Sequence, residues 1–441
     1  MERINPSTRK PILRRNLLLG AAVALVCSGG FSGMGFAAPD GGVVIGGNIT
    51  IDQTTPTTTI VTQTSDRGII DWRSFDVNTG ELVEFKQPHI QAITVNRVKN
   101  NPQKTTINGR IKANGNVVIL NENGVMFGEN SQIDVGGLVT STSDLFDDSE
   151  FMAGGNVRFK NGNNPHAGIE NKGSITAREG GLIGLVSPNV ENKGVIQARF
   201  GKVQIASADT VTIDFAGDGL IQIDVSNTVT KRIIRNEGVI SADGGEVLLT
   251  AATARSVIDS VIETKGTIRA NTLRQSNGVI KTGKIDINAG EGTLQMSGIL
   301  AADGDRILSG GTVYLKGRGV SAGGLISAVG ASGGQIGIQA GALSLAEGIT
   351  AEGLNGNGGL VTINALRNVF ETSTSRIILD GSVNGGTLIY KSGGNLVSSG
   401  RYFARGQTGI GGKVDITGGS VKFLSAHIYI QMVGSKADEF V

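Results

Sequence analysis

Acidic side chains form the densest group of chemically versatile residues in this 441-residue sequence. Residues 143–151, S-D-L-F-D-D-S-E-F, hold Asp144, Asp147, Asp148 and Glu150. Carboxylates gathered at one place serve as the acid and base of sugar hydrolysis, or coordinate Ca²⁺ through their oxygens. Their spacing and order match no calcium-binding loop, so we interpret the segment as a solvated connecting loop, with calcium chelation as the alternative.

The other residue types that support catalysis or metal binding are isolated. His89, His166 and His427 lie far apart in the sequence, and none has the spacing of metal ligands. Cys27 is the single cysteine, and we identify no strand-to-helix elbow that would hold a nucleophilic serine. The many glycine pairs precede predicted strands rather than helices, which argues against a phosphate-binding loop. We therefore expect no catalytic residue, no metal and no cofactor, and predict that the protein is not an enzyme.

The elements that carry these residues are predicted to be β-strands. Glycine occurs 68 times, aromatic residues make up 4% of the chain, and the 39% of hydrophobic residues are mostly Val, Ile, Leu and Ala. This composition favours a long core of aliphatic side chains over a core built around aromatic anchors. Apolar and polar residues alternate over short runs bounded by Gly, Asn and Asp, as is typical of strands joined by turns.

One nine-residue pattern recurs along the chain. Its copies are I-E-N-K-G-S-I-T-A at 169–177, V-E-N-K-G-V-I-Q-A at 190–198, I-R-N-E-G-V-I-S-A at 234–242 and I-E-T-K-G-T-I-R-A at 262–270. Repeats with periods of roughly 20 to 50 residues indicate a solenoid. The Ile and Val positions are expected to stack as aliphatic ladders inside it, and Asn171, Asn192 and Asn236 to form a ladder at a turn.

The predicted fold class is all-β, a right-handed parallel β-helix. Exposed strand edges of such a fold need to be covered. The strand-rich residues 41–61 precede the repeats, and we predict that they form an N-terminal β cap.

The first 37 residues have the pattern of an export signal. A basic stretch ends at Arg14-Arg15, an apolar run follows at 17–26, and small residues lead to Ala37. The apolar run is too short to span a bilayer as a helix. We predict a signal peptide over 1–37, cleaved between Ala37 and Ala38 after Sec export, with a twin-arginine signal as the alternative.

The net charge and the cysteine content of the chain also support export from the cytoplasm. The formal net charge of +2 depends on the basic residues of the export signal, which leaves no basic excess for nucleic-acid binding. Loss of the signal would also remove Cys27 and leave a mature chain without cysteine. A chain that cannot form disulfides in the periplasm suits export across a second membrane before folding.

A resemblance appears ahead of the repeats. Residues 117–128, V-V-I-L-N-E-N-G-V-M-F-G, and 130–142, N-S-Q-I-D-V-G-G-L-V-T-S-T, resemble the secretion domain of two-partner secretion (TpsA-type) exoproteins, the filamentous-haemagglutinin N-terminal family. Upstream segments agree in order, namely I-D-W-R-S-F at 70–75, V-E-F-K-Q-P at 83–88, N-R-V at 96–98 and I-N-G-R-I-K-A-N-G at 107–115. The family usually has Asn-Pro-Asn-Gly where this chain has Asn121-Glu122-Asn123-Gly124, and Asn-Gly is itself a strong turn signal.

The resemblance implies a mechanism of export. The chain would cross the periplasm unfolded, its N-terminal domain would be recognised by the periplasmic domains of a cognate outer-membrane TpsB-type transporter, and the β-helix would form outside. It implies a two-partner secretion domain over 38–260, continued by β-helix repeats over 261–441. The residues expected to take part in transporter recognition are Asn121, Asn123, Gly124, Asn96 and Arg97.

The expected function is that of an exoprotein, secreted or held at the surface of a Gram-negative bacterium and similar to an adhesin or haemagglutinin. Its expected partners are the transporter and glycans or proteins of host cells or matrix, and the chain is expected to be a monomer. The alternatives are a β-helical polysaccharide-degrading enzyme and a haem- or toxin-related exoprotein. An enzyme would need carboxylates gathered along one face, and a haem role would need loops bearing His, Met or Tyr.

Overall fold

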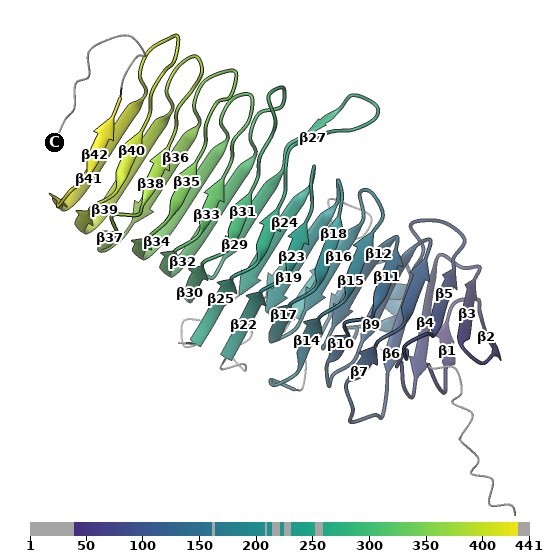
Figure 1. Cartoon of the computed structure of the whole chain (residues 1–441). Helices are drawn as coiled ribbons and strands as arrows, with labels where there is room; N and C mark the ends of the chain where they lie inside the picture. Colours follow the sequence, from purple (N-terminus) through teal and green to yellow (C-terminus); the bar gives the residue numbers. More distant parts are fainter. Residues whose placement is uncertain are drawn as a thin grey trace, which may run out of the picture. The chain divides into compact units, whose positions relative to one another are not determined.

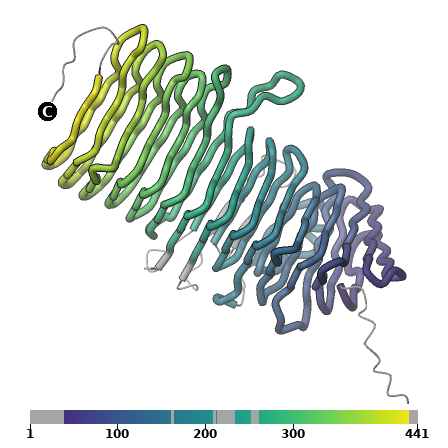
Figure 2. The backbone as a smooth tube through the Cα atoms, in the orientation of Figure 1, coloured from purple at the N-terminus to yellow at the C-terminus, as the bar shows by residue number. Residues whose placement is uncertain are grey.

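The computed structural model describes residues 39–160, 164–207, 210–213, 221–224, 231–251 and 259–430. Over these ranges the backbone winds in stacked coils, and equivalent strands of successive coils pair side by side (Figures 1 and 2). The strands form two long sheets of 22 and 15 members, with parallel pairing except at the N-terminal end. This is the parallel β-helix that the repeats predict. The signal peptide over 1–37 and the cleavage position Ala37–Ala38 lie outside the described residues.

The 22-stranded sheet contains β1 (Val43–Gly46), β4 (Arg67–Trp72), β6 (Ile93–Val98), β7 (Thr105–Ile107), β9 (Asn116–Leu120), β10 (Val125–Phe127), β12 (Gly137–Ser141), β14 (Gly168–Asn171), β16 (Leu182–Val186), β17 (Asn189–Asn192), β19 (Lys202–Ser207), β22 (Lys231–Asn236), β24 (Glu246–Ala251), β25 (Asp259–Thr264), β29 (Lys284–Asn288), β30 (Thr293–Met296), β32 (Thr312–Ala322), β34 (Gln335–Leu345), β36 (Leu360–Ala365), β37 (Val369–Glu371), β39 (Thr387–Ser398) and β41 (Lys413–Phe423). The 15-stranded sheet contains β2 (Ile49–Thr55), β3 (Thr58–Gln63), β5 (Leu82–Lys86), β8 (Arg110–Ala113), β11 (Gln132–Val135), β15 (Ser174–Ala177), β18 (Val195–Ala198), β23 (Val239–Ser241), β26 (Thr267–Arg269), β31 (Ile299–Ala301), β33 (Leu325–Ser327), β35 (Gly348–Thr350), β38 (Arg376–Ile378), β40 (Arg401–Phe403) and β42 (His427–Tyr429). A small sheet of β13 (Val157–Phe159), β20 (Thr210–Ile213) and β21 (Ile221–Asp224), the hairpin of β27 (Leu273–Arg274) and β28 (Ile280–Lys281), and helix α1 (Asp148–Met152) lie outside the coils.

The aliphatic ladders form as predicted. The repeat copies pair in register, with Ile169 opposite Val190, Val190 opposite Ile234, and Ile234 opposite Ile262. All four side chains are buried in one continuous core. Because strands alternate their side chains, this register keeps every second residue inside and leaves polar neighbours such as Glu191 outside.

The asparagine ladder is also confirmed. Asn171 Nδ2 donates to Asn192 Oδ1 at 2.8 Å, and Asn192 Nδ2 donates to Asn236 Oδ1 at 2.8 Å. All three side chains are fully buried. Phe127 occupies the equivalent position in the preceding coil and Thr264 in the following one, so the amide ladder ends there.

The N-terminal cap is built from antiparallel strands. β1 pairs antiparallel with β4, and β2 pairs antiparallel with β3, so each long sheet has a reversed strand at its first edge. Trp72 is buried beneath this cap, and its ring lies 2.4 Å from where a Cβ on Gly42 would stand. Glycine is therefore needed at position 42. The prediction that residues 41–61 form a β cap is confirmed.

A second apolar core lies outside the coils. Residues 142–160, which we call the strap, include α1 and β13 and lie over the outer face of β4, β6, β9 and β12. The side chains that form this core are Ile69, Ile93, Val95, Val118, Leu120, Val139, Leu182, Val186 and Ala206 from the coils, and Leu145, Phe151, Val157 and Phe159 from the strap. The sequence gives no strong helix signal here; α1 forms because Asp147 caps it, accepting hydrogen bonds from the backbone N–H groups of Ser149 and Glu150 at 2.7 and 2.9 Å.

The coils change character along the chain. We call residues 39–296 the proximal coils and 297–430 the distal coils. In the distal coils, two strands of the 22-stranded sheet merge into single strands of 11 or 12 residues, as in β32, β34, β39 and β41. β32 pairs with both β29 and β30, which shows that one long strand continues two shorter ones.

The distal core encloses a carboxylic acid. Glu371 occupies a position in register with Leu345 and Ser398 and is fully buried. Its carboxyl accepts hydrogen bonds from Tyr402 and, at 3.2 Å, from Ser375. Burial raises the pKa of Glu371, and the hydroxyls of Ser398, Tyr402 and Ser375 only partly oppose that shift.

Candidate functional site

The turn at 121–124 joins β9 to β10. Gly124 N–H donates to Asn121 O at 3.0 Å, and Asn123 N–H donates to Asn121 Oδ1 at 2.9 Å. Gly124 has φ +110°, and a Cβ there would stand 2.7 Å from Gly168 O in the next coil. Both facts require glycine. The tight turn therefore forms with Glu122 in the place where the family usually has proline.

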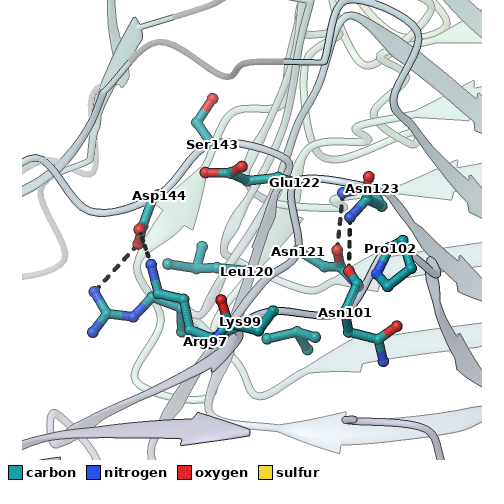
Figure 3. Close-up of a pocket in the computed structure, with 12 residues that line it drawn as sticks. Arg97, Lys99, Asn101, Pro102, Leu120, Asn121, Glu122, Asn123, Ser143 and Asp144 are labelled. Carbon is teal, nitrogen blue, oxygen red and sulfur yellow. Dashed lines mark hydrogen bonds and ion pairs between the residues drawn. The ribbon is translucent and has the colours of Figure 1, made fainter. Parts of the chain in front are cut away.

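Three of the five predicted recognition residues meet at one cavity. Arg97, Asn121 and Asn123 line a hollow of about 600 Å³ beside the turn (Figure 3). Lys99, Asn101, Glu122 and Asp144 line the same hollow. Asn123 Nδ2 donates to Asn101 O at 2.9 Å, and Asn121 Nδ2 donates to Thr105 Oγ1 at 3.0 Å, so both amides are held by the adjoining loop.

The other two predicted residues lie elsewhere. Asn96 is fully buried; its Oδ1 accepts from Trp72 Nε1 at 3.1 Å, and its Nδ2 donates to Val118 O at 3.4 Å. Gly124 is buried against the neighbouring coil. In the folded domain neither offers a side chain to a partner.

Arg97 is the electrostatic centre of this region. Its Nε donates to Asp71 at 2.7 Å, its Nη1 to Asp148 at 2.9 Å, and its Nη1 also reaches Asp144 at 3.3 Å. The guanidinium is nearly buried, with 9% of its side chain exposed. Bidentate pairing with Asp148 is completed by Nη2 at 3.0 Å, which is the geometry that favours arginine over lysine.

Asp144 is a second buried member of the network. Only 4% of its side chain is exposed, and it pairs with Arg97, Lys99 and Lys160. Burial alone would raise the pKa of Asp144, but the hydrogen bond from Lys99 and the charges of Arg97, Lys99 and Lys160 outweigh it and hold the pKa below its usual value. Burial likewise opposes the charge of Arg97, while Asp71, Asp148 and Asp144 together raise its pKa. Asp144 and Arg97 therefore stabilise each other in their charged forms.

The interpretation of residues 143–151 as a solvated loop is wrong. Asp144 and Asp148 pair with Arg97, Asp147 caps α1, and Glu150 pairs with Arg158 at 3.2 Å. Within the described ranges, no group of three His, Cys, Asp or Glu residues is placed to hold a metal ion. Asp144 and Asp148 fasten the strap to the coils through Arg97, whereas Asp147 and Glu150 meet partners within the strap itself.

A second arginine holds the middle of the strap. Arg67 on β4 donates to Phe151 O and Gly155 O, both at 2.6 Å, and to Gly154 O at 3.1 Å. Its guanidinium carbon also lies 4.9 Å from the centre of the Phe151 ring. Sequence analysis missed Arg67 and Lys99, because their partners in the strap follow them by 45 residues or more. It also missed Asp71, which pairs with Arg97 26 residues further along the chain.

Comparison with known proteins identifies the region. The sequence profile of the TPS secretion domain matches residues 36–296. The chain belongs to the TPS secretion domain family. Its structure is similar to the crystal structure of the HMW1 secretion domain from Haemophilus influenzae, with a TM-score of 0.69 and 25% sequence identity over 89% of this chain and 99% of that one.

Curated relatives match about half of the chain. Two heme/hemopexin-binding proteins of Haemophilus influenzae match, one at 33% identity over 249 residues and the other at 29% over 262 residues. Each match covers 55% of this chain but only 26% or 28% of the relative. The chain thus corresponds to about a quarter of the length of these relatives.

Membership places this TPS domain in two-partner secretion, in which an exoprotein leaves a Gram-negative bacterium through a dedicated outer-membrane transporter. The matched relatives are secretion domains and exoproteins named for binding rather than for catalysis. The profile ends at residue 296, and the β-helix coils continue without a break from β30 into β32.

Proposed function

We propose that this protein is a non-enzymatic adhesin-like exoprotein whose TPS domain is recognised by the periplasmic domains of a cognate transporter before the β-helix forms. The signal over 1–37 delivers it to the periplasm through Sec, the domain over 38–260 directs it to the transporter, and the coils over 261–441 present the binding surface as a monomer. The observation that carries the proposal is the TPS profile over 36–296, which includes the turn at 121–124.

Burial supports recognition of an unfolded segment. Asn96 and Arg97 are almost completely inaccessible in the folded domain. Asn123 is partly exposed at the mouth of the hollow. If the Asn96–Arg97 strand and the Asn121–Gly124 turn are both read by the transporter, they are read while the chain is extended. The same residues then become a core amide, a buried cation and a turn once the chain has emerged.

Folding outside the cell favours outward movement of the chain during export. Each added coil buries a row of aliphatic side chains, and that burial opposes return through the pore. The strap can close only after β4, β6 and β9 have stacked, because its apolar side chains need the face that those strands form together.

The export route is tested by secretion of the full chain in a Gram-negative host that either contains or lacks the cognate outer-membrane transporter, a β-barrel. We expect the chain in the medium or on the cell surface only when the barrel is present. Export that ignores the barrel, or a folded chain retained in the periplasm, would contradict the proposal.

Recognition is separated from folding by two isosteric variants. Asn123→Asp changes a partly exposed amide that holds Asn101 O, and Asn189→Asp changes a partly buried amide that holds Ala167 O. We expect at least a fivefold fall in secretion for Asn123→Asp, no more than a twofold change for the Asn189→Asp control, and similar thermal midpoints for both purified proteins. Equal secretion by the two variants would remove Asn123 from the recognised segment.

The distal surface supports the adhesin-like role. Its described strands and turns expose large apolar side chains, including Ile307 at 76%, Leu366 at 74% and Ile410 at 69%. Beads coated with the full chain should bind epithelial cells and agglutinate erythrocytes. Failure of coated beads to bind any cell type would reject the adhesive role and leave the export proposal standing.

A haem-related exoprotein is the second candidate, because the matched relatives are named for heme and hemopexin binding. The aligned region is only about a quarter of those relatives. Titration of the full chain with haem and, separately, with hemopexin distinguishes the candidates: saturable binding of either one favours this role over adhesion.

A further inference from the structure

A hollow on the distal coils combines three cations with a gap left by glycine. It has a volume of about 330 Å³ and is lined by Lys316, Arg318, Gln339, Gly341 and Arg367, among others. The three cationic side chains and Gln339 are exposed. Among the described residues, no carboxylate forms an ion pair with Lys316, Arg318 or Arg367, whereas most Lys and Arg residues of the proximal coils have such a partner.

The gap arises from an alternation of residues at one corner of the coils. Arg318 N–H donates to Gly292 O at 2.9 Å, and Arg367 N–H donates to Gly341 O at 2.8 Å. Gly394 N–H in turn donates to Arg367 O at 3.2 Å. Successive coils therefore place glycine, arginine, glycine, arginine and glycine at this corner. A Cβ on Gly341 would lie 2.3 Å from Arg318 O, so the middle position must be glycine.

The alternation sets the distance between the charges. Strands of neighbouring coils lie ~4.8 Å apart, so Arg318 and Arg367 are separated by about 10 Å along the stack. A second row lies two or three residues earlier in each coil and runs Lys316, Gln339, Asn364 and Lys391 in strict register. The two rows form a strip of regularly spaced donors and positive charges with a hollow at its centre.

The lining indicates which polyanion would fit. No aromatic residue lines the hollow, so it offers none of the stacking platforms that bind single-stranded nucleic acid. Leu366 is the only large apolar side chain in the lining, which is too little for a lipid surface. Glu291 is the one carboxylate that lines it, against three cations. Regular cations, amide donors and a single apolar contact suit a linear chain of hydroxylated rings with repeated negative charges.

We propose that Arg318, Arg367 and Lys316 form a binding site for an acidic linear polysaccharide on the distal coils. This inference rests on the proposed adhesive function, since it names the class of ligand that the distal surface would bind. The two arginines contact successive sulfate or carboxylate groups, Lys316 and Lys391 extend the contact along the stack of coils, and Gln339 meets ring hydroxyls between them.

Binding of polysaccharides to the purified full chain tests the site. The probes are heparin as a sulfated chain, hyaluronan as a carboxylated chain and dextran as a neutral one, measured by titration calorimetry at several salt concentrations. We expect binding of heparin, hyaluronan or both, weakening as salt rises, and no binding of dextran. Preference between heparin and hyaluronan identifies the anionic group. Absence of binding to both, or equal affinity for double-stranded DNA, would overturn the proposal.

Two double variants with the same loss of charge provide the control. Arg318→Gln/Arg367→Gln removes the arginines of the hollow, whereas Arg376→Gln/Arg401→Gln removes two exposed arginines on the 15-stranded sheet, which also lack a carboxylate partner among the described residues. We expect Kd to rise about tenfold or more for the first pair and by less than twofold for the second. Equal losses would show that binding follows net charge and not this site.

One more variant and one comparison complete the test. Gln339→Glu adds a carboxylate inside the hollow at an exposed position, and should weaken binding about as much as loss of one arginine while leaving the thermal midpoint unchanged. Unchanged affinity in this variant would overturn the site. Cell adhesion without polysaccharide binding would sink this inference but keep the adhesive function, and polysaccharide binding without adhesion would do the reverse.

Discussion

The proximal and distal coils share one kind of core and differ in how they treat their outer surface. In the proximal coils, ion pairs join neighbouring coils, such as Arg235 with Glu263 at 3.3 Å and Lys284 with Glu246 at 2.6 Å, and the strap covers an apolar outer face. In the described distal residues the ion pairs are Arg405–Asp380 and Lys413–Asp415. Stacked aliphatic ladders therefore suffice to hold the coils, and the outer surface of each region is free for another role, which we propose to be export for the proximal coils and binding for the distal coils.

The largest test of this contrast compares a buried with an exposed arginine. Arg97→Ala should cost about 3 to 5 kcal/mol of the free energy of unfolding, because it leaves Asp144 buried with reduced compensation and releases the strap. Arg405→Ala removes an exposed distal pair and should cost less than about 1 kcal/mol. Urea unfolding at pH 7 measures both. Similar losses for the two variants would remove the distinction between the regions.

The next effect concerns asparagine ladders. Asn192→Ala should cost about 2 to 3 kcal/mol, since it breaks both amide bonds and leaves the buried amides of Asn171 and Asn236 without their partner. Asn384→Ala breaks an exposed amide pair with Asn357 in the distal turns, and should cost less than about 1 kcal/mol because water replaces the bond. Thermal unfolding of both variants measures the two losses of stability. A larger loss of stability for Asn384→Ala than for Asn192→Ala would contradict this reasoning.

The buried carboxyl of Glu371 gives the distal coils a pH dependence of their own. Its pKa in the folded state is raised by burial, so the folded state binds the proton more tightly than the unfolded state. Its contribution to stability is fully present below the ordinary carboxyl pKa of about 4.3 and is lost as pH rises toward and through the raised value. Tyr390, Tyr402, Ser375 and Ser398 face it, and none supplies a positive charge.

Glu371→Gln should therefore stabilise the chain by about 1 to 2 kcal/mol at pH 8 and make little difference at pH 4, because the amide needs no proton to remain neutral. Unfolding by urea across this pH range measures the effect. A variant less stable than the native chain at pH 8 would show that the carboxyl is held in its charged form.

The smallest effect distinguishes paired from unpaired lysines. Lys284→Gln should cost about 0.5 kcal/mol at low salt and almost nothing at 1 M NaCl, because its pair with Glu246 is partly exposed. Lys391→Gln has no such partner among the described residues and should leave stability unchanged within error at either salt concentration. A salt-dependent loss at Lys391 would show that the distal cations also stabilise the coils.

Much of the fold follows from local pattern. Alternation of apolar and polar residues specifies which face of each strand is buried, and repetition specifies which residues stack, so the aliphatic and asparagine ladders could be read from residues 169–270. The cap at 41–61 followed from its strand-rich composition and its place before the repeats. The turn at 121–124 followed from Asn-Gly.

The candidate site could be predicted only in part. Arg97, Asn121 and Asn123 were found through the resemblance, and the structure brings them to one hollow. The carboxylates around Arg97 could not be assigned, because Asp71 precedes it by 26 residues and Asp148 follows it by 51. A segment rich in Asp and Ser is predicted to be a loop when the cations that pair with its carboxylates are not known.

By itself the sequence determined the β-helix, its cap, its repeat register and its family, because these depend on short-range periodicity and on ordered motifs. The tertiary structure alone decided where the strap lies, which carboxylates neutralise Arg97, and that Arg318 and Arg367 stand on either side of Gly341. The physical reason is that charge pairing and cavities depend on which coils become neighbours. In a stack whose coils differ in length, that neighbourhood is defined only once every coil is in register.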